Sequence, residues 1–135
     1  MTTFVVTQIE DFETNQKVNK LFRNGKCILD EFIKEIKADR NLSEEIGDLF
    51  AIIEDVANEE RLPKTKYRNL HLSKKLKYSP YEAKSKHLRL YLFHDKENGQ
   101  IIVLGGKKGT QLKDLSKFDK IIQEYTKYVQ QKNKP

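Results

Sequence analysis

The segment Leu88–Phe93, with the sequence LRLYLF, alternates strictly and constrains the fold more than any other segment. Successive side chains of a β-strand point to opposite faces, so this segment presents leucines on one face and an arginine and aromatic rings on the other. A second apolar run, Gln100–Leu104, follows Asn98-Gly99, a pair typical of a type I′ hairpin turn. We therefore expect an antiparallel hairpin in which Phe93 lies opposite Leu104.

Residue type and apolar spacing predict the other elements. Two further strands are expected at Thr3–Ile9 and Tyr81–Lys86. In three longer segments apolar residues recur every three or four positions, which is the spacing of an amphipathic helix. These segments are Gln16–Lys37, Ser43–Glu60 and Thr110–Gln131. The pair Asn24-Gly25 falls inside the first helix and is able to divide it, and Lys64–Ser79 is expected to be a loop with short extended pieces.

In chain order these elements read β-α-α-β-β-β-α along a single domain, residues 1–135. The late strands are neighbours in the sequence and are expected to pair as a small antiparallel or mixed sheet of three or four strands. Helices would pack against the leucine face of this sheet, which defines an α+β fold. That arrangement leaves Arg89, Tyr91 and Phe93 on the other face.

Charge is divided unevenly along the chain, although the net charge is only +6. Residues 1–60 carry seven Lys or Arg and 14 Asp or Glu, a net charge of −7. Residues 61–135 carry 19 Lys or Arg and six Asp or Glu, a net charge of +13. A surface of one sign attracts partners of the opposite sign, and Lys and Arg neutralise nucleic-acid phosphates. The second half of the chain is therefore expected to bind a polyanion.

Other features of the sequence favour a cytoplasmic protein. The one cysteine, Cys27, has no partner for an intramolecular disulfide, which fits a reducing compartment. No apolar run approaches the roughly 20 residues of a membrane span. The spacing of Cys and His does not match a zinc site, so we expect neither a metal nor another cofactor.

The segment Leu76–Gln111 carries short motifs that resemble a protein family. They are Tyr81-Glu82-Ala83-Lys84, then Arg89 in the alternating strand, then Gly106-Lys107-Lys108-Gly109-Thr110-Gln111 after the next apolar strand. Together with the element order, they resemble the RelE/HigB/ParE superfamily of toxins from bacterial toxin–antitoxin systems. The resemblance implies a RelE-like fold and a ribosome-dependent endoribonuclease that cuts mRNA and is neutralised by an antitoxin protein.

The resemblance also implies roles for individual residues. Arg89 matches the strand arginine that contacts the scissile phosphate, and Lys108 matches a basic position after the glycine. His94 is a candidate for proton transfer, because the reference pKa of histidine is near neutral. Candidates for binding RNA or phosphate are Lys84, Lys86, Lys107, Tyr91 and Gln111.

Several interpretations stay open at this stage. Arg89 is either a phosphate ligand or a cross-strand salt-bridge partner of Glu82. The segment after the basic pair, Leu112–Leu115, lacks the tyrosine of RelE-type enzymes, and the C-terminus lacks the histidine of other members. These departures favour a non-catalytic module of the same fold that binds nucleic acid or protein. A ParE-like inhibitor of a DNA-processing enzyme is a third hypothesis.

Overall fold

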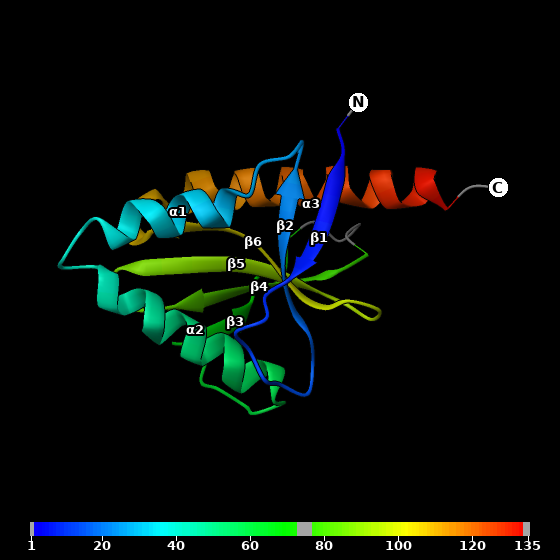
Figure 1. The fold of residues 1–135 in the computed structure, drawn as a ribbon. Coiled ribbons are helices and arrows are strands. Elements are labelled where there is room, and N and C mark those ends of the chain that lie inside the picture. Colours follow the sequence, from blue (N-terminus) through cyan, green and yellow to red (C-terminus); the bar gives the residue numbers. More distant parts are fainter. Residues whose placement is uncertain (1, 73–76, 134–135) are drawn as a thin grey trace.

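The computed structural model describes residues 2–72 and 77–133, which form six strands and three α-helices (Figure 1). The strands are β1 (Phe4–Gln8), β2 (Val18–Arg23), β3 (Tyr67–Asn69), β4 (Ser79–Lys84), β5 (Leu88–Asp95) and β6 (Gly99–Lys107). The helices are α1 (Ile28–Lys37), α2 (Ser43–Ala57) and α3 (Gln111–Lys132), and a 3₁₀ turn, η1 (Lys108–Thr110), precedes α3. Part of the predicted loop Lys64–Ser79, and Leu76 of the family-like segment, lie outside the described residues.

All six strands belong to one sheet, in the order β1-β2-β6-β5-β4-β3. Neighbouring strands are antiparallel except β2 and β6, which are parallel, so the sheet is mixed. The predicted α+β class is confirmed. The expected number and order of strands are wrong, because β2 and β3 were not foreseen.

The segment Gln16–Lys37 is the main correction, since it is a strand followed by a helix and not one helix. Asn24 and Gly25 both have positive φ, 51° and 80°, as a type I′ turn requires. Arg23 and Lys26 exchange backbone hydrogen bonds of 2.8 and 3.0 Å across this turn. The chain therefore reverses at residues 24–25, and a helix begins only afterwards.

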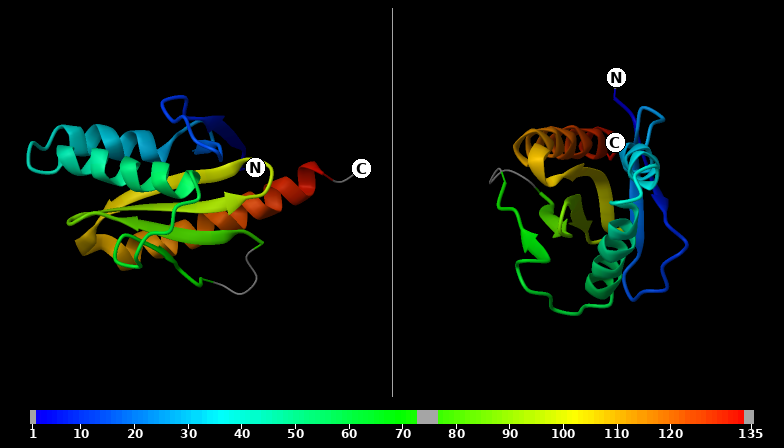
Figure 2. Two further views of the ribbon diagram at one scale, coloured as in Figure 1. Left: turned by 90° about the horizontal axis from the view of Figure 1, so that it is seen from below. Right: turned by 90° about the vertical axis from the view of Figure 1, so that its left-hand side faces the viewer.

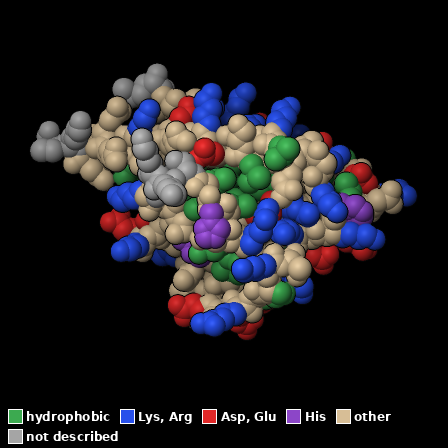
Figure 3. All heavy atoms as spheres, turned by 180° about the vertical axis from the view of Figure 1, so that it is seen from behind, with side chains coloured by type: hydrophobic (Ala, Val, Ile, Leu, Met, Phe, Trp, Pro, Cys, Tyr) green, Lys and Arg blue, Asp and Glu red, His purple; other side chains and the backbone are tan. Residues whose placement is uncertain are grey.

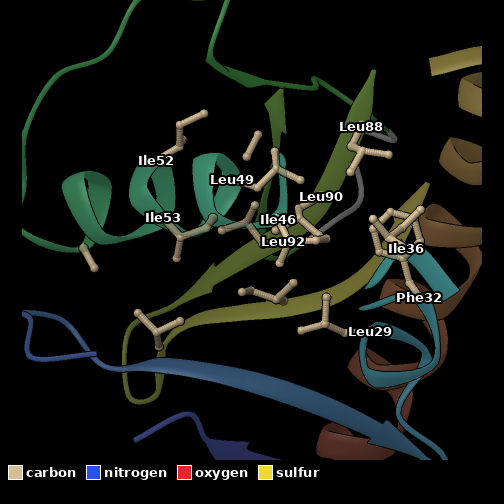
Figure 4. Close-up of a cluster of buried hydrophobic side chains, with 14 of the residues drawn as sticks. Leu29, Phe32, Ile36, Ile46, Leu49, Ile52, Ile53, Leu88, Leu90 and Leu92 are labelled. Carbon is tan, nitrogen blue, oxygen red and sulfur yellow. The ribbon is translucent and has the colours of Figure 1, made fainter. Parts of the chain in front are cut away.

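Helices cover both faces of the sheet (Figure 2). On the leucine face, Leu88, Leu90 and Leu92 pack between α1 and α2, as predicted (Figure 4). On the opposite face, α3 packs its own apolar residues against Tyr91 and Phe93. The expectation that this second face is open was therefore wrong. None of the helices in the described parts of the chain has the length and apolar character needed to cross a membrane.

The β5–β6 hairpin differs from the predicted two-residue turn. Three residues, 96–98, separate the strands, and Gly99 begins β6 with a φ of +78°. Phe93 lies opposite Ile101 and not Leu104, because the loop occupies residues 96–98 and not the pair Asn98-Gly99, which moves the pairing by three residues. A β-bulge further from the turn, between Tyr91 and Leu92, shifts the pairs beyond it by one residue.

Candidate functional site

Arg89 on β5 is the most unusual charged residue of the fold. Its exposed fraction is only 7%. Its Nη1 donates hydrogen bonds to the carbonyl oxygens of Ser85 and Leu88, at 2.7 and 2.8 Å. Its Nε is buried and has no hydrogen-bond partner in the described residues, and no carboxylate there lies within ion-pair distance. A guanidinium stays charged when buried, so this position carries positive charge that no ion pair balances.

Glu82 on β4 is fully buried and does not pair with Arg89. One carboxylate oxygen accepts a hydrogen bond from Arg68 Nε at 2.8 Å, and the other accepts one from Gln111 Nε2 at 2.7 Å. Arg68 lies on β3 and Gln111 is the first residue of α3. Glu82 thus ties the edge strand and the start of α3 to the middle of the sheet. The alternative that Arg89 forms a salt bridge with Glu82 is wrong.

Tyr91 lies opposite Glu82 on the neighbouring strand and is completely buried. Its hydroxyl has no hydrogen-bond partner within residues 2–72 and 77–133. Burial, and then the negative charges of Glu82 and Asp114, raise the pKa of Tyr91 far above its usual value. The hydroxyl of Tyr91 therefore keeps its proton. The buried ring is not free to stack on a nucleotide base.

The first turn of α3 closes over this cluster at Gly106. A Cβ atom at position 106 would collide with the carboxylate of Asp114, so a larger residue here would displace that side chain. The hydroxyl of Thr110 donates a hydrogen bond of 2.6 Å to the same carboxylate. The glycine that belongs to the family-like motif thus has a packing role.

Lys84 adds a third cation beside Arg68 and Arg89. It lies directly opposite Arg89 across the β4–β5 pair, so the two side chains share a face. Burial lowers the pKa of Lys84, and the charges of Arg68 and Arg89 lower it further, while Glu82 partly opposes them. Lys84 and Arg89 thus lie as neighbours at this end of the sheet, while Arg68 alone forms an ion pair with Glu82.

Two connections meet beside these cations, the β4–β5 turn and the junction between β6 and η1. Leu88 is paired with Lys107, and the backbone N–H of Lys108 donates to the carbonyl of His87 at 2.8 Å. The view of the α3 side shows Lys and Arg side chains spread over this surface (Figure 3). We call the five basic residues at this end the basic edge, and they are Lys84, Lys86, Arg89, Lys107 and Lys108.

A second polar cluster, which the sequence did not predict, fixes the β4–β5 turn. Glu45 of α2 accepts hydrogen bonds from the hydroxyl of Ser85 and from the backbone N–H of His87, the latter at 2.7 Å. His87 Nδ1 lies 2.7 Å from the other carboxylate oxygen. Burial alone would raise the pKa of Glu45, but the hydrogen bonds from Ser85 and His87 outweigh it and lower this pKa to about 2.

The structure brings most of the predicted site residues together. The basic edge contains all five predicted lysine and arginine positions, and Gln111 and Tyr91 lie behind it. His94 is separate, because it lies on the leucine face. There it is 2.9 Å from the hydroxyl of Tyr67 and stacks on Tyr81, and burial lowers its pKa.

Residues that the sequence analysis missed include Arg68, Glu45 and Asp114. The alternation expected of a strand places Glu82 on the same face as Lys84, so its position near the basic residues was predictable. Arg68 lies on a three-residue strand that periodicity does not reveal, and Glu45 is in a helix whose charged residues resemble an ordinary solvated face. Their roles depend on the register of β3 and on the docking of α2.

The surface has two hollows, which differ in their position relative to the basic edge. One lies between α2 and the β4–β5 turn and is lined by Asp48, Asp55, Lys66, Lys84, Ser85 and Lys86, among others. A larger one lies at the opposite end of the sheet, where Phe4, Lys17, Tyr78, His94 and Tyr125 contribute to it. Only the first hollow borders the basic edge.

Neither polar cluster resembles a metal centre. In the parts of the chain that the structure describes, no three His, Cys, Asp or Glu side chains are grouped so as to hold an ion. No family model, curated protein or solved structure was found to match the chain. Function is therefore argued from the geometry of the basic edge and from the short motifs quoted above.

Proposed function

We propose that the protein is a RelE/HigB-like toxin, a ribosome-associated endoribonuclease that cleaves mRNA and is neutralised by an antitoxin protein. The observation that carries the proposal is Arg89, a buried guanidinium with an unpartnered Nε and no carboxylate to balance it. An RNA phosphate would supply the missing negative charge. The antitoxin and the ribosome are proposed from the family resemblance alone.

The geometry suits phosphate chemistry. In RNA cleavage the 2′-oxygen attacks the adjacent phosphorus, the bond to the 5′-oxygen breaks, and the oxygens of the phosphoryl group carry extra negative charge at the transition state. Cations held in place before the reaction stabilise that charge most strongly in a partly dry site. Arg89 and Lys84 are such cations, because strand pairing and burial fix their positions. The products would be a 2′,3′-cyclic phosphate and a 5′-hydroxyl.

The exposed lysines of the basic edge would position the RNA. Lys86, Lys107 and Lys108 lie on the two connections that meet there, so they are free to contact successive phosphates. His94, in contrast, lies on the leucine face with Tyr67 and Tyr81, and we assign it no part in the reaction.

Cleavage of ribosome-bound mRNA by the wild-type protein and by Arg89→Ala tests the proposal. We expect the variant to lose cleavage by about 10²–10³-fold, as when one transition-state ligand is removed. Arg23→Ala is a matched control, since Arg23 pairs with Glu124 on the surface of α3, away from the basic edge. Intact ribosome-bound mRNA at every concentration of wild-type protein would show that the enzymatic proposal is wrong.

A non-catalytic RNA-binding module is the second candidate, and the enclosure of Glu82 favours it. Both oxygens of this carboxylate are occupied by Arg68 and Gln111, and Tyr91 is fully buried, so neither group faces an exposed substrate. In this case RNA affinity would fall with salt without any cleavage. Each lysine of the basic edge replaced by alanine should then reduce the slope of log K against log[salt] by about one.

A further inference from the structure

The proposed reaction needs a group that takes the proton from the 2′-hydroxyl, and the basic edge itself contains only cations. Candidates must lie beside Arg89 and have a free lone pair. Glu82 has both oxygens occupied, and Tyr91 is a buried donor. His87 is the remaining titratable group of the β4–β5 turn, and 54% of its side chain is exposed.

The environment of His87 fixes its tautomer. Glu45 is held ionised by its hydrogen bonds, and its carboxylate accepts from Nδ1 of the ring at 2.7 Å. A carboxylate accepts only from a protonated nitrogen, so Nδ1 carries the hydrogen, and Nε2 is the nitrogen whose lone pair is left to take a proton. The same carboxylate also accepts the backbone N–H of His87, which limits rotation of the whole residue.

His87 also belongs to the turn that receives the Arg89 guanidinium. Nη1 of Arg89 bonds to the carbonyl oxygens of Ser85 and Leu88, which flank residues 86–87 on both sides. On its other side, the carbonyl of His87 accepts the N–H of Lys108. The Arg89 guanidinium and the His87 ring are therefore both held by the same short turn, with the ring bonded to Glu45 of α2.

From this arrangement we infer that His87 is the general base of RNA cleavage and that Glu45 is its positioning residue. The inference rests on the proposed function and names the proton acceptor that the proposal leaves open. Nε2 of His87 takes the proton of the 2′-hydroxyl while the 2′-oxygen bonds to phosphorus. The bond from phosphorus to the 5′-oxygen breaks, and that oxygen takes a proton from solvent.

The charges around His87 come from several elements. Glu45 and, one turn further along, Asp48 face the turn from α2. Lys86 precedes His87 in the turn, Arg89 follows on β5, and Lys108 contacts it from η1. One anion is thus bonded to the ring, and the cations Lys86, Arg89 and Lys108 belong to the turn or bond to its backbone.

The test compares wild type, His87→Ala and a matched control, His71→Ala, whose histidine is exposed on the loop after β3. Cleavage of ribosome-bound mRNA is measured across pH, with and without added imidazole, and RNA affinity is measured with an uncleavable 2′-deoxy analogue. We expect His87→Ala to bind the analogue within about twofold of wild type but to lose about 10²–10⁴-fold in cleavage rate. Imidazole should restore part of the rate, and the acidic limb of the pH profile should disappear.

Three results would overturn the inference. Cleavage by His87→Ala at the wild-type rate would exclude His87 and leave the proposed function standing. A loss without imidazole rescue and with an unchanged pH profile would show a structural role for His87. Binding without cleavage by the wild-type protein would overturn the proposed function and the inference together.

A measurement on wild-type protein covers the case in which His87→Ala does not fold. The ¹⁵N resonances of the His87 ring should show a protonated Nδ1 and a bare Nε2. The Nε2 resonance should move when the 2′-deoxy analogue is added. An Nε2 resonance that stays unchanged at saturation would overturn the inference.

Discussion

The two faces of β5 are built from alternate residues of one strand, yet they differ in chemistry. On one face Leu88, Leu90 and Leu92 meet α1 and α2 in an apolar core. On the other face Tyr91 and Phe93 meet α3, but Arg89 at the start of the strand is buried beside Lys84 and Glu82. Apolar contacts are sufficient to hold helices on a sheet, and buried charges are costly. Arg89 differs from the other buried charges, Glu45 and Glu82, because it has no partner of opposite charge in the described residues.

The contrast between the two faces of β5 requires that the leucine face contribute strongly to stability. Leu92 is completely buried there, and Leu92→Ala should lower the free energy of unfolding by about 2–5 kcal/mol, because it removes apolar contacts and leaves a cavity. Urea denaturation measures this change. Leu112→Ala is the control, since Leu112 is 86% exposed on α3 and should change stability by no more than about 0.5 kcal/mol. RNA affinity of the folded Leu92→Ala protein should match wild type.

A smaller effect is expected on the charged face. Glu82→Gln keeps the shape of the side chain but removes the charge that accepts from Arg68 and Gln111. We expect a loss of about 2–3 kcal/mol in unfolding free energy, together with tighter RNA binding because a negative charge behind the basic edge is removed.

The matched control is Glu124→Gln, whose carboxylate also binds an arginine, Arg23, but with 25% of the glutamate side chain exposed. That variant should cost no more than about 1 kcal/mol. Equal losses in the two variants would mean that burial of Glu82 has no special importance.

The third prediction concerns Glu45 and the pH dependence of stability. Its expected effect on the free energy of unfolding is the smallest of the three. Its pKa in the folded protein is about 2, below the ordinary value of 4.5. A carboxyl group whose pKa is lower in the folded state contributes stability above pH 4.5 and loses it as the pH falls toward 2.

Wild type should therefore exceed Glu45→Gln in unfolding free energy by about 1–2 kcal/mol at pH 7, and this advantage should vanish near pH 2. Urea denaturation at several pH values tests it, with the exposed neighbour in Glu44→Gln as control. A difference between wild type and Glu45→Gln that is constant with pH would contradict the assignment.

Sequence reasoning identified elements where a single period extended over enough residues. The pattern of α2 and α3 and the alternation of β5 belong to this group. The six residues of β2 were misassigned because Val18, Leu21 and Phe22 fit the spacing of a helix as well as a strand. The pairing that decides the matter joins β2 to β6, some 80 residues away, and no local pattern records it.

The candidate site was predictable where it depended on alternation alone. Arg89, Tyr91 and Phe93 were expected on the face opposite the leucines, and the structure places them there. The burial of Arg89 was not predictable, because it depends on the tertiary packing around the end of β5. The Glu45–His87 pair joins two segments whose relative position only the tertiary fold determines.

The parallel pairing of β2 with β6 has a consequence for the order of folding. Only three residue pairs join these strands, from Val18 opposite Gln100 to Lys20 opposite Ile102. A ribosome synthesises β2 long before β6. Until β6 is made, Val18 and Leu21 of the β1–β2 hairpin stay exposed to solvent. Contacts so distant in sequence slow folding and extend the time in which apolar residues are exposed. We expect the hairpin to be the last part of the sheet to gain protection from hydrogen exchange and the first to lose it.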